Sequence, residues 1–320
     1  AGGALLIGLC VSIVSALAGM LLLHRLVALD FGSEVATTTV MLLAWYPGSL
    51  ALSGVYTDAL FLALSVGSIY SARRGRWATA GALGALAAMT RSAGLGLVVP
   101  LLALYVWGPR ADRAAPVGGG SGSSLAERLR SRYAIERSIA WVALVPAGLA
   151  AYAAYLGIET GNPLAFVTAQ DEWERIVAPL AGLPLAVWGA IQGVGQFLPG
   201  VGPDSVLTPA GPYPAGVGLR NVALLGFLAL ALWLLTESFR RLPLAYAAYA
   251  VAALALPLSV PALDEPLKSL PRFMLVVFPL WIALALWVRE RERRFRWVSG
   301  AFGFLLVVFA GLFTTWVQAP

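Results

Sequence analysis

The sequence is poor in charge and in residues that bind metals. Only 12% of its 320 residues are charged, and cysteine, histidine and lysine occur once each. A single cysteine, Cys10, excludes a disulfide within this chain, and His24 has no second histidine or cysteine near it, so we predict no transition-metal centre. The small charged fraction also excludes an ordinary soluble domain.

What the sequence has in abundance is apolar residues. They make up 59% of the chain, and the mean hydropathy is +0.81. A bilayer core of roughly 30 Å requires about 20 apolar residues in a helix, and the runs here are continuous, unlike the alternating segments of a barrel strand. We therefore predict an all-α, polytopic membrane protein with about ten membrane segments, at residues 4–23, 35–53, 59–72, 77–89, 95–107, 138–158, 221–235, 244–260, 273–288 and 297–317.

The arginines predict the orientation. The net charge is +6, and the positive residues cluster in four breaks between apolar runs, at 73–76, 110–137, 240–241 and 289–296. Such breaks are typical of cytoplasmic loops, so we interpret them as orientation signals and not as a nucleic-acid surface. The other breaks, at 53–58, 90–94, 159–214 and 261–272, are then extracytoplasmic.

We predict one transmembrane domain over residues 1–320. Residues 110–137 contain PVGGGSGSSLAER and form a cytoplasmic, flexible, basic loop. Residues 159–214 form an extracytoplasmic loop with interfacial or re-entrant segments, among them 180–198. The chain opens with Ala1 almost inside an apolar run, and we expect it to be a fragment without its original N-terminus.

The extracytoplasmic breaks contain polar residues that topology does not require. Tyr56, Thr57 and Asp58 stand where the chain re-enters the membrane. Thr57 and Asp58 suit the first turn of a helix, where side-chain oxygens cap free N–H groups and a carboxylate complements the helix dipole. Capping does not exclude a site role, in which Tyr56 and Asp58 line one extracytoplasmic cavity.

A second polar stretch is ETGNPLAFVTAQDEWERIV. Phe166, Gln170 and Trp173 have the i, i+4, i+7 spacing of one helical face, and acidic residues such as Asp171 occupy much of the rest. The pattern predicts an amphipathic helix in the membrane interface, with tryptophan at the depth of the headgroups. The segment also borders the expected site.

Two arginines lie at membrane depth on the side where positive charge is unexpected. Arg91 separates two short apolar runs, and Arg272 immediately precedes another. An arginine at a helix centre costs about 2.5–3.5 kcal/mol, which indicates a functional counter-ion. A guanidinium matches phosphate with two parallel hydrogen bonds. The alternative for Arg91 is a side chain that extends to the interface.

Three segments together resemble a known family. They are LAWYPGSLALSGVYTDALF with the following AAMTRSAGLGL, then GNPLAFVTAQDEW, and finally LPRFMLVVFPLWIALA. In this order they are similar to motifs of the PIG-V family of mannosyltransferases, within the GT-C superfamily of multi-span glycosyltransferases. Asn162 stands where the family pattern has an acid.

The resemblance implies a GT-C-like enzyme of the plasma membrane that moves a sugar, usually mannose, from a polyprenyl-phosphate donor to an extracytoplasmic acceptor of unknown identity, with inversion. It implies that Arg91 and Arg272 hold the lipid phosphate, beside Tyr56, Gln170, Asp171 and Trp173, with a divalent cation as an open option. The family's usual catalytic acid lies in a first loop that has no counterpart here. The base is therefore Asp58 or Asp171, or it lay upstream of Ala1, or the chain is inactive.

Two other classes remain open from the residues alone. A transporter or flippase for an anionic or lipid-linked substrate also places arginines at broken spans, but such proteins usually have repeated halves, and we find no repeat. A non-catalytic membrane scaffold gives Arg91 and Arg272 no purpose.

Overall fold

The computed structural model describes residues 2–113, 133–195, 215–263 and 265–314. Within these ranges the chain is helical and contains no β-strand, apart from one isolated antiparallel bridge between Arg175 and Ala262. The predicted all-α fold is confirmed.

Three predictions concern residues outside the described ranges. They are Ala1, on which the expectation of a missing N-terminus depends, the central part of the predicted basic loop at 114–132, and part of the long extracytoplasmic loop at 196–214. The first described element, α1 (Gly2–Phe31), begins directly after Ala1 and includes the predicted run at 4–23. The prediction that the chain opens close to an apolar helix is therefore confirmed, while the expectation that it is a fragment stays a prediction.

In the described part of the chain, four helical segments are long and apolar enough to cross a membrane: α1, α8 (Leu144–Thr160) together with the 3-10 turn before it (Arg137–Ala143), α11 (Ala215–Arg241) and α15 (Glu292–Thr314). The remaining helices have 16 residues or fewer, which at 1.5 Å per residue is about 24 Å at most. They are α2 (Ser33–Trp45), α3 (Leu50–Ser53), α4 (Asp58–Arg73), α5 (Trp77–Thr90), α6 (Val98–Trp107), α9 (Ala165–Thr168), α10 (Gly182–Gly195), α12 (Leu244–Leu258), α13 (Leu270–Leu275) and α14 (Phe278–Arg289).

Two of the predicted runs are bent. The run at 35–53 consists of α2 and a second helical piece, Pro47–Ser53, which meet at 74° and can count as a fifth, broken span. The bend falls at Tyr46, whose backbone is extended because the next residue is Pro47. The run at 273–288 breaks between α13 and α14. There the Trp281 indole N–H donates to the carbonyl oxygens of both Met274 and Leu275, each at 3.2 Å, at the end of α13.

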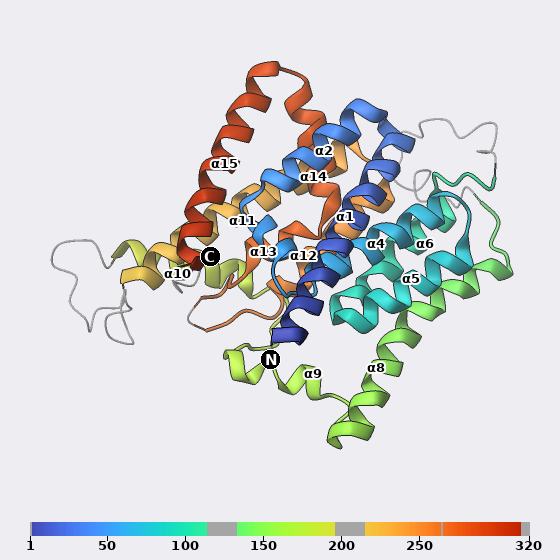
Figure 1. Ribbon diagram of the computed structural model, residues 1–320, viewed down its shortest axis with the longest axis horizontal. Coiled ribbons are helices and arrows are strands. Elements are labelled where there is room, and N and C mark those ends of the chain that lie inside the picture. Colours follow the sequence, from blue (N-terminus) through green and yellow to red (C-terminus); the bar gives the residue numbers. More distant parts are fainter. Residues whose placement is uncertain (1, 114–132, 196–214, 264, 315–320) are drawn as a thin grey trace.

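Several helices that are consecutive or close in the chain pack side by side. α1 packs on α4, α4 on α5 and α5 on α8, while α10 packs along α11 (Figure 1). α5 and α8 approach closely because the contact is made by small residues, as is usual between membrane helices. A Cβ atom on Gly148 of α8 would overlap the backbone of Ala85 in α5. α10 covers most of the segment predicted to be re-entrant or surface-lying, and its Gln192 is buried.

Buried ion pairs join the helix ends at the predicted cytoplasmic side. Asp30, at the end of α1, pairs with Arg73 at the end of α4, and Tyr246 of α12 donates a hydrogen bond to the same carboxylate. The sequence identifies Arg73 as an orientation signal, and the structure shows in addition that it is buried and paired with Asp30 of α1.

Arg110 also differs from the exposed, flexible loop residue that the sequence predicts. Only 5% of it is exposed, and its guanidinium donates to both carboxylate oxygens of Asp112, at 2.7 and 2.5 Å. These bonds hold the pKa of Asp112 below its ordinary value. The Trp77 indole N–H donates to the same carboxylate at 3.2 Å. The start of the predicted loop is therefore part of the packed structure.

Candidate functional site

The chain turns inside the bundle at Arg91. α5 ends at Thr90, Arg91 is extended (φ −151°, ψ 137°), and a 3-10 helix, η2 (Ser92–Leu97), leads into α6. The Gly94 N–H donates to the Arg91 carbonyl at 2.8 Å. A Cβ atom on Gly94 would lie 2.5 Å from the backbone of Ala88, so only glycine fits this turn. The turn directs the Arg91 side chain toward α4 and α13.

Asp58 holds both predicted arginines. Arg91 Nη1 donates to its Oδ1, and Arg272 Nε donates to its Oδ2 at 2.7 Å. Asp58 begins α4, Arg91 follows α5 and Arg272 lies in α13, so the carboxylate joins three helices. The Asp58 side chain is fully buried, whereas 16% of Arg91 and 32% of Arg272 are exposed.

This geometry bears on two expectations about single residues. The Thr57 side chain makes no capping bond at the start of α4, and the Asp58 carboxylate pairs with the two guanidinium groups. Arg91 pairs with Asp58 within the bundle, which favours a site role over the alternative of a side chain that extends to the interface. Two positive charges share one negative charge, so the cluster has one positive charge in excess among the residues that the structure describes.

Aromatic rings surround the two guanidinium groups. Arg91 lies 5.8 Å from the ring centre of Phe61 and 5.4 Å from that of Phe273, and Arg272 lies 4.4 Å from that of Tyr56. The ring faces attract cations and restrict the access of water. Tyr56 therefore contacts the site through Arg272.

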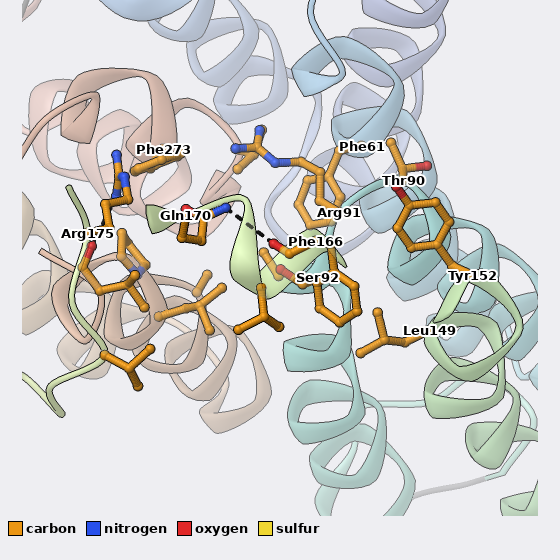
Figure 2. A pocket seen from close by; sticks show the side chains of 18 residues that line it. Phe61, Thr90, Arg91, Ser92, Leu149, Tyr152, Phe166, Gln170, Arg175 and Phe273 are labelled. Atoms are coloured by element: carbon orange, nitrogen blue, oxygen red, sulfur yellow. Dashed lines mark hydrogen bonds between the residues drawn. The ribbon is translucent and has the colours of Figure 1, made fainter. Parts of the chain in front are cut away.

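A cavity of about 490 Å³ opens beside Arg91 (Figure 2). This volume lies in the range usual for small-molecule sites. Figure 2 shows Tyr152 and Leu149 on one side and Arg175 and Phe273 on the other, with Gln170 and Phe166 between them. The lining is largely apolar, and its polar members are Thr90, Arg91, Ser92, Tyr152, Gln170 and Arg175.

One wall of the cavity is built from two loops and not from the predicted amphipathic helix. α9 ends at Thr168, a 3-10 turn covers Asp171–Trp173, and Glu174 adopts a left-handed conformation (φ 51°). The next residues pair with the loop after α12, where the Ile176 N–H donates to the Pro261 carbonyl at 3.0 Å. A continuous helix over this stretch was a wrong prediction, because the backbone bonds to the distant loop instead.

Arg175 is a lining residue that the sequence analysis did not select. Its guanidinium donates to the carbonyls of Val260, at 3.0 Å, and Lys268, at 3.2 Å, and lies 5.8 Å from the Phe273 ring centre. In the sequence it stands among Glu172 and Glu174, where it has the pattern of a solvated helix face. Only the pairing with residues some 85 to 93 positions later brings it to the site.

The other predicted residues divide into three groups. Arg91 and Gln170 line the cavity. Asp58 and Arg272 do not line it, but Asp58 pairs with both arginines, and Tyr56 contacts Arg272. Neither Tyr56 nor Asp58 lines this cavity, and the expectation that the two line one extracytoplasmic cavity stays a prediction. Asp171 and Trp173 are exposed and do not line it, and Trp173 lies 5.7 Å from the Lys268 ammonium.

The described residues contain no group of three or more His, Cys, Asp or Glu side chains that can hold a metal ion. The option of a divalent cation thus stays a prediction.

Fold and site together define a class: a helical protein with helices long and apolar enough to span a membrane, and with a cationic cluster around the buried Asp58 beside a largely apolar cavity. Comparison with known proteins adds no family, since no family model, curated protein or solved structure matches the chain.

Proposed function

We propose that this chain is a membrane glycosyltransferase that moves a sugar, mannose by its resemblance to the PIG-V family, from a polyprenyl-phosphate donor to an extracytoplasmic acceptor. The main support for this proposal is the cluster of Asp58, Arg91 and Arg272, which has one positive charge in excess and adjoins a cavity with mostly apolar walls. A lipid phosphate brings both the missing negative charge and an apolar tail.

The chemistry follows from where charge develops. The acceptor hydroxyl attacks the anomeric carbon on the face opposite the phosphate, so the configuration inverts while the bond to the phosphate oxygen breaks. The leaving lipid phosphate gains negative charge, which fixed guanidinium donors stabilise. Arg91 and Arg272 each have five N–H donors, of which the bond to Asp58 uses one. The remainder are available to phosphate oxygens.

Asp58 fits a positioning role better than the role of base. It is fully buried, both of its oxygens accept bonds from arginine, and it does not line the cavity. In this role its two carboxylate oxygens hold the guanidinium groups of Arg91 and Arg272 in fixed positions relative to each other. Asp171 is the other candidate for the base within the chain, and it is exposed beside Gln170, which lines the cavity. A base upstream of Ala1 is the alternative to Asp171.

The same proposal includes a GT-C-like arrangement of about ten membrane segments, in which the short helices cross as broken or half-spans. It places the protein in the plasma membrane with the cavity on the extracytoplasmic side. The support is the distribution of arginines, since α4, α11 and α14 all end in arginine at the predicted cytoplasmic side.

The test is sugar transfer by the purified protein in liposomes, with polyprenyl-phosphate mannose and a panel of acceptors. In Arg91→Gln or Arg272→Gln a single arginine remains on Asp58 and the excess charge disappears. Because a hydrogen bond to a charged group contributes about 1.5–3 kcal/mol, we expect the KM for the donor to rise by roughly tenfold to a hundredfold. Arg91→Lys keeps the charge and should rescue part of this loss.

Asp171→Asn separates the proposed roles, since a missing base lowers kcat and leaves the KM for the donor unchanged. An unchanged kcat in this variant would instead favour a base upstream of Ala1. Absence of transfer with every donor and acceptor, together with movement of lipid-linked substrate across the liposome membrane, would replace the enzyme by a flippase. Unchanged donor kinetics in both arginine variants would refute the phosphate assignment.

A further inference from the structure

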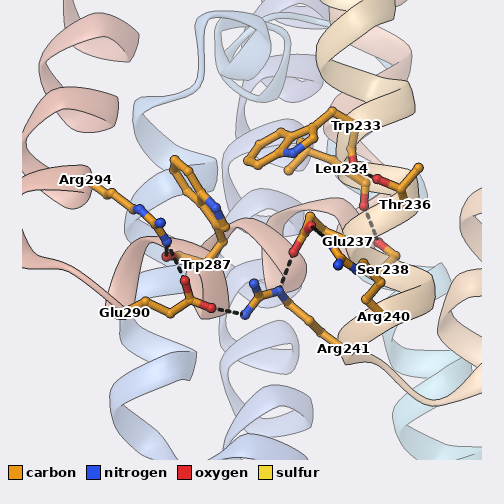
Figure 3. A network of polar contacts seen from close by, with 10 residues as sticks. All are labelled: Trp233, Leu234, Thr236, Glu237, Ser238, Arg240, Arg241, Trp287, Glu290 and Arg294. Atoms are coloured by element: carbon orange, nitrogen blue, oxygen red, sulfur yellow. Dashed lines mark hydrogen bonds and ion pairs between the residues drawn. The ribbon is translucent and has the colours of Figure 1, made fainter.

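A second charged cluster lies at the other end of α14, away from Arg272. Glu237 of α11 pairs with Arg240, at 3.1 Å, and with Arg241, while Glu290 pairs with Arg241, at 2.6 Å, and with Arg294, at 2.5 Å (Figure 3). The result is a chain of three arginines and two glutamates that joins the ends of α11 and α14 to the start of α15. Both carboxylates are shared between two arginines, so the chain keeps one positive charge.

The neighbouring acidic residues are already neutralised. Glu34, at the start of α2, pairs with Arg289, and Glu292 pairs with Arg296 at 3.5 Å. Each of these is a one-to-one pair. Neither glutamate therefore compensates the excess charge of the cluster.

Two more arginines add to that excess. The side chains of Arg291 and Arg293 are exposed, and neither forms an ion pair with any residue that the structure describes. Arg240 pairs with Glu237 but remains 76% exposed. The turn between α14 and α15, together with the end of α11, thus presents three positive charges in excess, on side chains that are free to reach outward.

Apolar surface continues directly from this basic turn. α15 begins there and is long and apolar enough to cross a membrane, and Trp297, Phe304 and Val307 on it are 69–78% exposed. Tryptophan is enriched at the depth of lipid headgroups. Arg294 is held in place over the ring of Trp287, at 4.2 Å. A positive turn followed by an exposed apolar helix matches a molecule with a negative head and hydrocarbon tails.

We propose that this basic turn, defined by Arg240, Arg291 and Arg293, binds the phosphate headgroup of an anionic phospholipid whose acyl chains lie along α15. The proposal is independent of the sugar-transfer function, because the site lies beyond the opposite end of α14. It goes beyond the orientation rule, which needs positive charge on one side of the membrane but no defined place for it. Each arginine near the surface of the cytoplasmic leaflet raises the affinity for anionic lipids about fivefold.

The test compares lipid binding by native mass spectrometry of the purified full chain in detergent, with phosphatidylglycerol against phosphatidylcholine of the same acyl chains. We expect tighter binding of phosphatidylglycerol, and a loss on the order of 20-fold in the double variant Arg291→Gln/Arg293→Gln. The matched control is Arg74→Gln/Arg76→Gln, which removes two exposed arginines from the turn between α4 and α5. It should change the binding by less than about twofold. Circular dichroism confirms that both variants are folded.

Three outcomes overturn the proposal. The first is equal binding of the two lipids by the unaltered chain. The second is an equal loss in the control variant, which indicates diffuse attraction and no defined site. The third is binding of soluble glycerophosphoglycerol as tight as that of the whole lipid, because it excludes a contribution of the acyl chains along α15.

Discussion

Replacing Asp58 by asparagine tests whether one carboxylate holds the site together. The change keeps the size of the side chain but leaves Arg91 and Arg272 without their common counter-charge. Removing one partner of a buried ion pair costs about 3–5 kcal/mol. Because both guanidinium groups retain some exposure, we expect the free energy of unfolding to fall by about 3 kcal/mol, the lower end of this range.

A double-mutant cycle with Arg272→Gln isolates the pair itself. The bond of 2.7 Å between Arg272 Nε and the fully buried carboxylate predicts a coupling energy of about 2 kcal/mol. The measurement is equilibrium unfolding in mixed detergent micelles, followed by circular dichroism. The matched control is the cycle of Glu34→Gln with Arg289→Gln, an exposed pair for which we expect a coupling of about 0–1 kcal/mol.

A coupling energy below about 0.5 kcal/mol between Asp58 and Arg272 would refute this reasoning, since that value is typical of residues that do not interact. The same conclusion would follow if Asp58→Asn unfolded at the same detergent concentration as the unaltered chain.

Two further substitutions test the local structure. Gly94→Ala places a methyl group 2.5 Å from the Ala88 backbone and should lower the free energy of unfolding by about 1–3 kcal/mol in the same assay. The control is Gly226→Ala in α11, where a Cβ meets nothing within 4 Å, and it should stabilise the protein by about 0.5–1 kcal/mol. Equal effects of the two substitutions would contradict the close turn at Gly94. Asp112→Asn should lower the free energy of unfolding at pH 7 by about 1.5 kcal/mol, because it removes the bond from Arg110 that lowers the pKa of Asp112. The ionised carboxylate contributes this stability above the unfolded-state pKa of about 3.9, and the contribution is lost as the pH falls through the lower folded-state pKa. The melting temperatures of the unaltered chain and of Asp112→Asn should therefore converge as the pH falls below about 4. A difference between them that stays constant in this range would exclude the ion pair as its cause.

The sequence predicted the all-α fold because the apolar runs are long and continuous, but only four or five of the ten predicted segments are long and apolar enough in the described structure to cross a membrane. It also grouped Asp58, Arg91 and Arg272 on one predicted side, and the structure brings the three residues together. It did not predict that Asp58 pairs with both arginines, because this pairing depends on how α4, α5 and α13 are aligned. A carboxylate before an apolar run has the same pattern whether it caps a helix or pairs with a distant cation.

The wall of the cavity was not predictable from local patterns. The i, i+4, i+7 spacing of Phe166, Gln170 and Trp173 indicated one helix, but hydrogen bonds to the loop after α12 take the place of helical bonds. Arg175 enters the site through carbonyl groups of that loop, and such contacts have no residue-type signature. The spacing of apolar residues indicates which face of a helix would be apolar. It does not indicate whether a distant loop will form hydrogen bonds with the backbone of the segment in place of the helical bonds.

The close contact of α5 with α8 has a consequence for recognition at the cavity. α5 carries Thr90 and leads directly into Arg91, and α8 carries Leu149 and Tyr152, so a contact that admits no methyl group at Gly148 fixes these lining residues relative to one another. Their order is established when the protein folds, and a ligand does not have to impose it. This wall is therefore preorganised for binding, because the conformational entropy of positioning the arginine beside its apolar neighbours is already lost in the free protein and does not reduce the affinity for a ligand.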